Sequence, residues 1–173
     1  MKWCHGWFAC FALFPLVFCT LHCHAFEFAG YKSGVSLQDT QARAVQLGDA
    51  ANSVGSILTI NRRIAETDGF DTYLLFFCNN RLYQLNHPEP FSASSFVTLL
   101  KNQMDQYGVP EVTSSRLSIG NNNPVTQAEF KWKTASDIIS LSINASDGSR
   151  EELKIAPSMV QLYSDSTIEC SKQ

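Results

Sequence analysis

The chain has 173 residues and a formal net charge of −3. This length suits a single domain, and no Gly/Ser linker or low-complexity tract divides it. The mildly acidic balance argues against broad nucleic-acid binding, which requires a basic stripe.

The first 25 residues have the pattern of a secretory signal peptide. Lys2 supplies one positive charge, an apolar core runs over residues 7–21, and the small residue Ala25 follows. That core is too short for a transmembrane helix, which needs about 20 apolar residues. We therefore predict a signal peptide at 1–25 and a single exported α+β domain at 26–173. Such a domain would lie in a periplasm or outside the cell, with no transmembrane segment.

Removing that leader would also remove most candidate metal ligands. Of the cysteines and histidines, only Cys78, Cys170 and His87 lie beyond it. A structural zinc site usually needs about four Cys or His ligands and a catalytic site about three. We therefore expect no metal, no cofactor and no standard catalytic set. His87 lies in NHPEP, where the prolines predict an irregular loop, and we interpret it as a solvated loop residue.

Two segments have the pattern of amphipathic helices, and we expect both to pack on the same face of a sheet. At 36–48, Ser36 can cap a helix with Asp39 three residues later, and Gly48 can end it. Leu37, Ala44 and Val45 give this helix a modest apolar stripe. At 92–107 the helical spacing is clearer, and the sequence YGVP supplies a stop. The apolar residues at helical spacing in the second helix are Phe96, Leu99, Leu100, Met104 and Tyr107.

The segments between the two helices have the pattern of strands. Residues 56–64 are rich in β-formers. The run TYLLFFC at 72–78 is nearly continuous in apolar residues, which favours a central strand covered on both faces. Asn79 and Asn80 then accept the positive φ of a tight turn, so residues 71–87 are predicted to form a hairpin.

Several more strands are predicted after the second helix. A strand at 111–119 precedes the strictly alternating segment 125–134 and its successor 137–145. The dipeptide DG then turns the chain into a further strand at 150–157.

Together these elements predict an α+β fold. Two helices would pack on one face of a largely antiparallel sheet of about six to seven strands. The order is a helix and about three strands, then a helix and about four strands, which fits a degenerate duplication of α-β-β-β units.

The helix opening GVSLQDTQARAVQLG, ahead of a strand pair, resembles the small bacterial envelope proteins in which a GMS/T-x-x-E/Q-V helix begins an α-β-β-β unit. These include the SmpA/OmlA outer-membrane assembly lipoproteins and, more remotely, the β-lactamase inhibitor proteins, which have two such units. This chain has no lipobox, and has Val35 and Thr40 where Met and Val are usual. The resemblance implies an assembly or inhibitor role, and it carries over no functional residue.

Cys78 and Cys170 are predicted to form a disulfide, because thiols tend to oxidise in exported proteins. The bond would place their Cα atoms within about 7 Å of each other. It would also bring residues 159–163 beside the 71–87 hairpin, as a late strand or extended segment. A reactive thiol pair would be expected to have C-x-x-C spacing, which these cysteines lack.

Two classes of function are open. The first is a non-enzymatic envelope protein that binds another exported protein through an open sheet face or an exposed loop. Aromatic and arginine side chains dominate interface energetics, although each candidate also fits ordinary strand packing or a solvated face. The candidate contacts are Arg81, Tyr83, Arg116, Lys131, Trp132 and Lys133. The second class is a hydrolase or sugar-active enzyme with a carboxylate pair such as Asp68 and Asp71.

Overall fold

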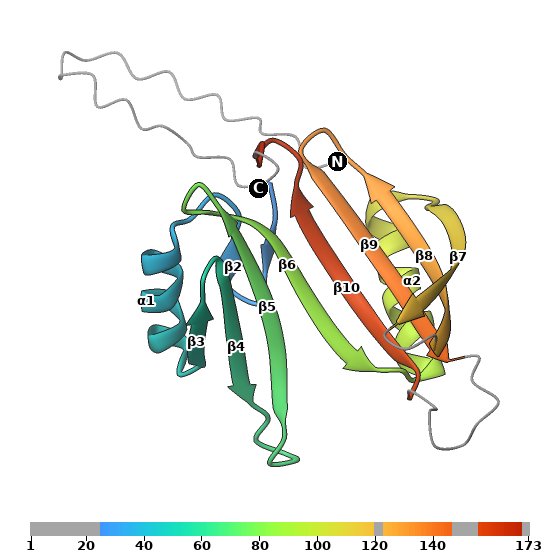
Figure 1. Cartoon of the computed structure of the whole chain (residues 1–173), viewed down its shortest axis with the longest axis horizontal. Helices are drawn as coiled ribbons and strands as arrows, with labels where there is room; N and C mark the ends of the chain where they lie inside the picture. The colour runs from blue at the N-terminus through green and yellow to red at the C-terminus, as the bar shows by residue number, and fades with distance from the viewer. Residues whose placement is uncertain (1–24, 120–122, 147–155, 171–173) are drawn as a thin grey trace.

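A computed structural model describes residues 25–119, 123–146 and 156–170, and the predicted signal peptide lies outside these ranges. The described chain folds into strands that are flanked by two helices (Figure 1). The elements in chain order are β1 (Glu27–Phe28), β2 (Tyr31–Lys32), α1 (Leu37–Leu47), β3 (Ala50–Val54), β4 (Ile57–Arg63), β5 (Phe70–Cys78), β6 (Arg81–Pro90), α2 (Ala93–Tyr107), β7 (Glu111–Ile119), β8 (Asn123–Lys133), β9 (Asp137–Ser146) and β10 (Ser158–Asp165).

Eight of the described strands form one antiparallel sheet in the order β3-β4-β5-β6-β10-β9-β8-β7, and β1 and β2 form a separate hairpin. The sheet has two halves of four consecutive strands each. The helix α1 precedes the first half, β3 to β6, and α2 precedes the second half, β7 to β10. The halves join where β6 pairs with β10, from Gln84 opposite Ser164 to Pro90 opposite Ser158.

The predicted fold class is wrong. The described chain is mostly strand, with one eight-stranded antiparallel sheet and a two-stranded sheet, and the two helices are minor components. The first half has four strands after its helix where about three were predicted, and the second half has four, so the halves are not α-β-β-β units. The missed elements gave little periodic signal: β1 and β2 have two residues each, and all five residues of β3 are exposed. The strand expected at 150–157 falls mainly outside the described residues, and 156–157 precede β10.

The two helices form where the sequence predicted them, and their ends explain why. Ser36 Oγ accepts a hydrogen bond from the Asp39 amide at 3.1 Å, so one orphan donor of the first turn is satisfied. Gly48 ends α1 with φ of 76°, a left-handed conformation that costs glycine little. The α2 helix is capped by Ser92, and the Gly108 amide donates to the Met104 carbonyl at 2.8 Å.

Both helices and the β1–β2 hairpin lie on the same face of the sheet, which we call the covered face. Cross-strand pairs define it, because directly opposite residues share a face: Leu75 lies opposite both Leu58 and Leu85. Ala44 of α1 belongs to the buried core on this face, and four α2 residues pack against that core. The buried core is Phe26, Tyr31, Ala44, Leu58, Ile60, Tyr73, Leu75, Phe77, Leu82, Leu85, Trp132, Ile139, Leu141, Met159 and Tyr163.

Two positions differ from the expected burial. On α2 the buried residue is Gln103, whose Nε2 donates to the Tyr163 hydroxyl at 3.1 Å, whereas Met104 is 40% exposed. The β5 strand is not covered on both faces, since Leu74 and Phe76 are only half-buried on the face away from the helices. A run of apolar residues therefore marked a strand whose second face is covered by neither of the two described helices.

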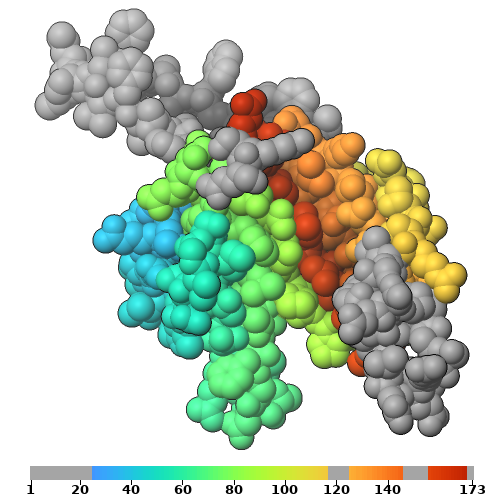
Figure 2. Space-filling model, viewed as in Figure 1, coloured from blue at the N-terminus to red at the C-terminus, as the bar shows by residue number. Residues whose placement is uncertain are grey.

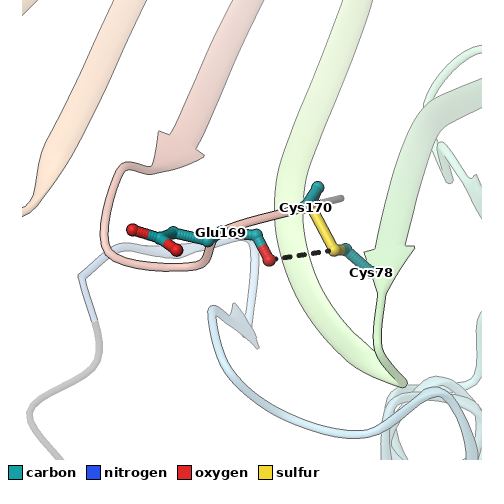
Figure 3. Close-up of a disulfide and its surroundings, with 3 residues drawn as sticks. All are labelled: Cys78, Glu169 and Cys170. Atoms are coloured by element: carbon teal, nitrogen blue, oxygen red, sulfur yellow. Dashed lines mark hydrogen bonds between the residues drawn. A yellow bond between two sulfur atoms is a disulfide. The ribbon is translucent and has the colours of Figure 1, made fainter. Parts of the chain in front are cut away.

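The β5–β6 hairpin and the cysteine pair are confirmed. Asn79 and Asn80 turn the chain with φ of 50° and 58°, the left-handed values that a tight hairpin needs. Cys78 and Cys170 are joined as a disulfide, with Cα atoms 5.6 Å apart (Figure 3). The Cys78 sulfur also lies 3.6 Å from the Glu169 carbonyl oxygen. Because a disulfide sulfur carries no hydrogen, this is a van der Waals contact and not a hydrogen bond. As expected, residues 159–163 lie beside the hairpin, within β10.

Candidate functional site

The second face of the sheet, here called the open face, has neither helix over it. Figure 2 looks onto this face, where strands from both halves of the sheet reach the molecular surface. The pairing register aligns its side chains in rows that run across the strands. One row is Asn52, Thr59, Leu74, Asn86, Leu162, Ser140, Lys131 and Glu111. A second row is Ile57, Phe76, Gln84, Ser164, Ile138 and Lys133.

Among the described residues, the middle of the open face carries no charged side chain. We define the central band as the open-face residues of β5, β6 and β10 that mix apolar and neutral polar side chains. The central band is Thr72, Leu74, Phe76, Gln84, Asn86, Pro88, Val160, Leu162 and Ser164. Charged side chains lie to either side, with Arg63 on β4 and Glu129, Lys131 and Lys133 on β8. A charge-depleted centre between charged margins is the usual anatomy of a protein interface.

Three candidate contacts from β8 divide between the two faces. Lys131 and Lys133 lie on the open face, and the Lys131 ammonium is 3.2 Å from a Glu129 carboxylate oxygen. Trp132 is 3% exposed on the covered face, and its Nε1 donates to the Gly108 carbonyl at 2.8 Å. Trp132 is therefore a core residue that anchors the end of α2, and its position does not support a role in partner contact.

The other three candidates lie apart from those lysines. Arg81 and Tyr83 follow the β5–β6 turn, where the ladder between these strands has an irregularity. Arg116 lies on the edge strand β7 opposite Thr126, on the same side of the sheet as the covered-face residues. The six residues therefore do not form one continuous surface, and the central band is a better-defined candidate.

His87 corrects the expectation of a solvated loop histidine. It lies within β6, buried on the covered face, because the two prolines beside it still allow strand pairing with β10. Its Nε2 is 2.5 Å from an Asp71 carboxylate oxygen, and its Nδ1 is 3.1 Å from a Glu89 carboxylate oxygen. The Tyr73 hydroxyl donates to the second oxygen of Asp71.

The polar cluster around His87 continues toward α2. Gln161 Nε2 donates to the Glu89 carboxylate at 2.6 Å, and the Tyr163 hydroxyl is 3.3 Å from Gln161 Oε1. Burial raises the pKa of Tyr163 to about 12, so this hydroxyl stays protonated. The Phe28 ring covers the cluster, with its centroid 4.6 Å from Tyr163 and 5.7 Å from His87.

A second buried cluster, formed around Asp49, contacts the first cluster through the Tyr73 ring. Arg62 donates to both Asp49 oxygens, at 2.9 and 2.7 Å, and the Tyr31 hydroxyl donates to Asp49 at 2.6 Å. Burial favours a raised pKa for Asp49, but the hydrogen bonds from Arg62 and Tyr31 outweigh it, and the pKa lies below its usual value. The Arg62 guanidinium lies 5.5 Å from the centre of the Tyr73 ring, a cation–π contact.

These two clusters form a polar chain from Gln103 of α2 to Tyr31 of the β1–β2 hairpin. Its charged and phenolic groups are directed at one another, which is the arrangement of a structural network. Sequence reasoning missed it because its members come from β2, β4, β5, β6, β10, α2 and the α1–β3 connection, and only the tertiary fold brings them together.

The two aspartates of the enzyme hypothesis have different partners. Asp68 is exposed and forms an ion pair with Arg63 at 2.7 Å. Asp71 is engaged by His87 and Tyr73. Within the described residues no cluster of three or more His, Cys, Asp or Glu side chains could hold a metal ion. Neither of the two described helices is long and apolar enough to cross a membrane.

Comparisons with known proteins found no matching family model, no matching curated protein and no matching solved structure.

Proposed function

We propose that this chain is an exported, non-enzymatic protein that binds another exported protein through the central band of its open face, as an assembly factor or inhibitor. The observation that carries the proposal is the one-sided sheet. Both helices and the β1–β2 hairpin pack on the covered face, while nine neutral residues of mixed polarity occupy the middle of the other face.

The composition of the central band supports a protein partner. Leu74, Phe76 and Leu162 supply apolar area, and Gln84 and Asn86 supply amides that both donate and accept hydrogen bonds. A partner that binds there does not have to remove water from a charged side chain. Desolvation of charges is the largest free-energy cost of burying a polar surface. The charged margins on β4 and β8 suit the solvated rim of an interface.

Two features support export to a periplasm or the outside of a cell. The leader has the order of a signal peptide, and the cysteines outside it are positioned to form a disulfide, which persists in oxidising compartments. N-terminal sequencing of the protein from the exported fraction should find a start close to residue 26. An intact Met1 in that fraction would contradict cleavage.

The binding role is tested by capturing partners from the exported fraction with wild type and two charge variants. Leu162→Lys places a charge in the central band, and Val97→Lys places one on α2, where Val97 is already 62% exposed. The same partner should be crosslinked by wild type and Val97→Lys and lost with Leu162→Lys. Equal capture by all three proteins would show that the partner binds elsewhere.

A further inference from the structure

The structure contains a hollow that the proposed partner surface does not use. It has a volume of about 460 Å³ and lies at the end of the sheet where the β3–β4 turn, the β5–β6 turn and the start of α1 meet. Its lining residues are Leu37, Gly55, Ser56, Phe77, Cys78, Asn79, Asn80, Tyr83 and Cys170. A volume of this size suits a small molecule or a single large side chain.

The hollow is held in shape by bonds between segments that are distant in the sequence. The disulfide ties the end of β5 to residue 170, and both cysteines are part of the wall. Asn80 Oδ1 accepts a hydrogen bond from the Leu37 amide at 3.2 Å, which fixes the β5–β6 turn against the start of α1. The Phe77 amide donates to the Ser56 carbonyl at 2.8 Å, which fixes the β3–β4 turn. A preformed wall reduces the entropy cost of binding.

The wall is neutral and has free hydrogen-bonding capacity. None of its nine residues is charged. Three of its side chains make no hydrogen bond with another residue in the described part of the chain. They are the Ser56 hydroxyl, the Asn79 side-chain amide and the Tyr83 hydroxyl. Charged ligands would lose hydration here without gaining an ion pair, so the wall favours an uncharged ligand.

The apolar part of the wall favours an aromatic ring. Tyr83 is one of the lining residues, and aromatic pairs gain about 0.5–1.5 kcal/mol beyond the area that they bury. The disulfide sulfurs are polarizable, and sulfur makes favourable contacts with aromatic rings.

We propose that this hollow is a binding site for an uncharged aromatic group, with Tyr83 and the disulfide against the ring and Ser56 and Asn79 bonding to its polar substituents. The group comes from a free small molecule or from an aromatic side chain of a polypeptide. The lining of this site includes no residue of the central band. The proposal therefore does not depend on the proposed partner binding.

The test is a titration of the full exported chain, with its disulfide intact, followed by backbone amide chemical shifts. Three probes are used: indole, N-acetyltryptophanamide and the non-aromatic cyclohexanol. We expect saturable shifts at Ser56, Asn79 and Asn80 with indole or N-acetyltryptophanamide and none with cyclohexanol. Binding of indole identifies a small-molecule site, whereas binding of N-acetyltryptophanamide alone identifies a polypeptide side chain. No saturable shift with either aromatic probe, or equal shifts with cyclohexanol, overturns the proposal.

Variants locate the binding in the hollow. Ser56→Trp fills it and should abolish the shifts, whereas Val97→Trp adds the same side chain on the exposed surface of α2 and should leave them unchanged. Tyr83→Leu keeps an apolar wall but removes the ring, and it should weaken binding by about two- to tenfold. Unchanged binding in both Ser56→Trp and Tyr83→Leu, with native circular dichroism, would also overturn the proposal.

Discussion

The buried polar side chains of the covered face are satisfied by one another, with few exceptions. His87 lies between Asp71 and Glu89, and Arg62 lies between Asp49 and the Tyr73 ring. Such groups are costly to bury alone and acceptable when paired. The two exceptions among the described residues are Gln103 Oε1 and Asp137 Oδ1, buried oxygens without a partner. The paired and the unpaired residues therefore give opposite predictions for substitution.

Replacing His87 with leucine should destabilise the fold. The substitution keeps a side chain of similar size but leaves Asp71 and Glu89 without their shared partner. Because these carboxylates are 30% and 27% exposed, water offsets part of the loss, and we expect about 1–3 kcal/mol. Urea unfolding measures the change. Asp68→Asn, which removes an exposed ion pair, is the control and should cost less than about 1 kcal/mol. Equal losses in both variants would show that His87 is not part of a buried network.

Replacing Asp137 with asparagine should stabilise the fold at neutral pH. Burial, and secondarily the Asp165 charge, raise the pKa of Asp137 above its usual 3.8. A carboxyl with a raised pKa contributes stability when protonated, and that contribution is lost as the pH rises through the raised value. The asparagine variant lacks this loss.

The free energy of unfolding of Asp137→Asn should therefore match wild type below pH 3.8 and exceed it once the pH has risen through the raised pKa. Asp105→Asn, at an exposed position that pairs with Lys101, is the matched control and should show no such gain. An Asp137→Asn variant that is less stable than wild type at pH 7 would contradict a destabilising effect of the buried charge on this carboxylate.

At the scale of elements, local signals located the helices, the hairpin turn and most strands of the large sheet, whereas β3 and the burial of Gln103 depend on tertiary contacts. Ser36, Gly48 and the Asn79–Asn80 pair act through their own backbone, so the sequence predicted their roles. The β3 strand has no buried residue and hence no apolar alternation to detect. The burial of Gln103 instead of Met104 depends on Tyr163, which lies 60 positions away in the chain.

The disulfide should stabilise the fold without taking part in any chemistry. Cys78→Ser opens a loop with a sequence separation of 92 and should lower stability by roughly 2–5 kcal/mol. Reduction should have the same effect on wild type and none on the variant, as thermal unfolding with and without reductant can show. Two accessible thiols in the oxidised wild-type protein would contradict the bond. A serine variant with full stability but impaired partner binding would indicate a redox role.

At the scale of the whole molecule, both described helices lie on one face of the sheet and neither lies on the other, although Ser140 and Ser142 of β9 are buried on that second face. The pairing of β6 with β10 in the middle of the sheet makes the open face continuous across both halves. Strand alternation in the sequence predicted individual two-faced strands, but the assembly of eight strands into one sheet depends on the long-range β6–β10 pair. For the same reason the candidate contacts taken from single strands scattered over both faces, whereas the central band emerged only from the register.

Two adjacent leucines of β5 test this sidedness. Leu75 is fully buried on the covered face, and Leu74 is half-buried on the open face. Leu75→Lys should destabilise the fold by more than about 4 kcal/mol, because the ammonium has no partner in the core. Leu74→Lys should cost less than about 1.5 kcal/mol, since its stem can lie along the sheet with the charge in water. Similar losses in the two variants, measured by urea unfolding, would show that both faces of β5 are covered.

The most direct measurement of the proposed function is site-specific photocrosslinking in the native exported fraction. A photoreactive side chain at Asn86, in the centre of the central band, is compared with one at Thr98, an exposed position of α2. A single partner band should form from Asn86 and disappear when Leu162→Lys is added, and Thr98 should give none. Crosslinking from Thr98 alone, or from Asn86 without sensitivity to Leu162→Lys, would contradict binding through the open face.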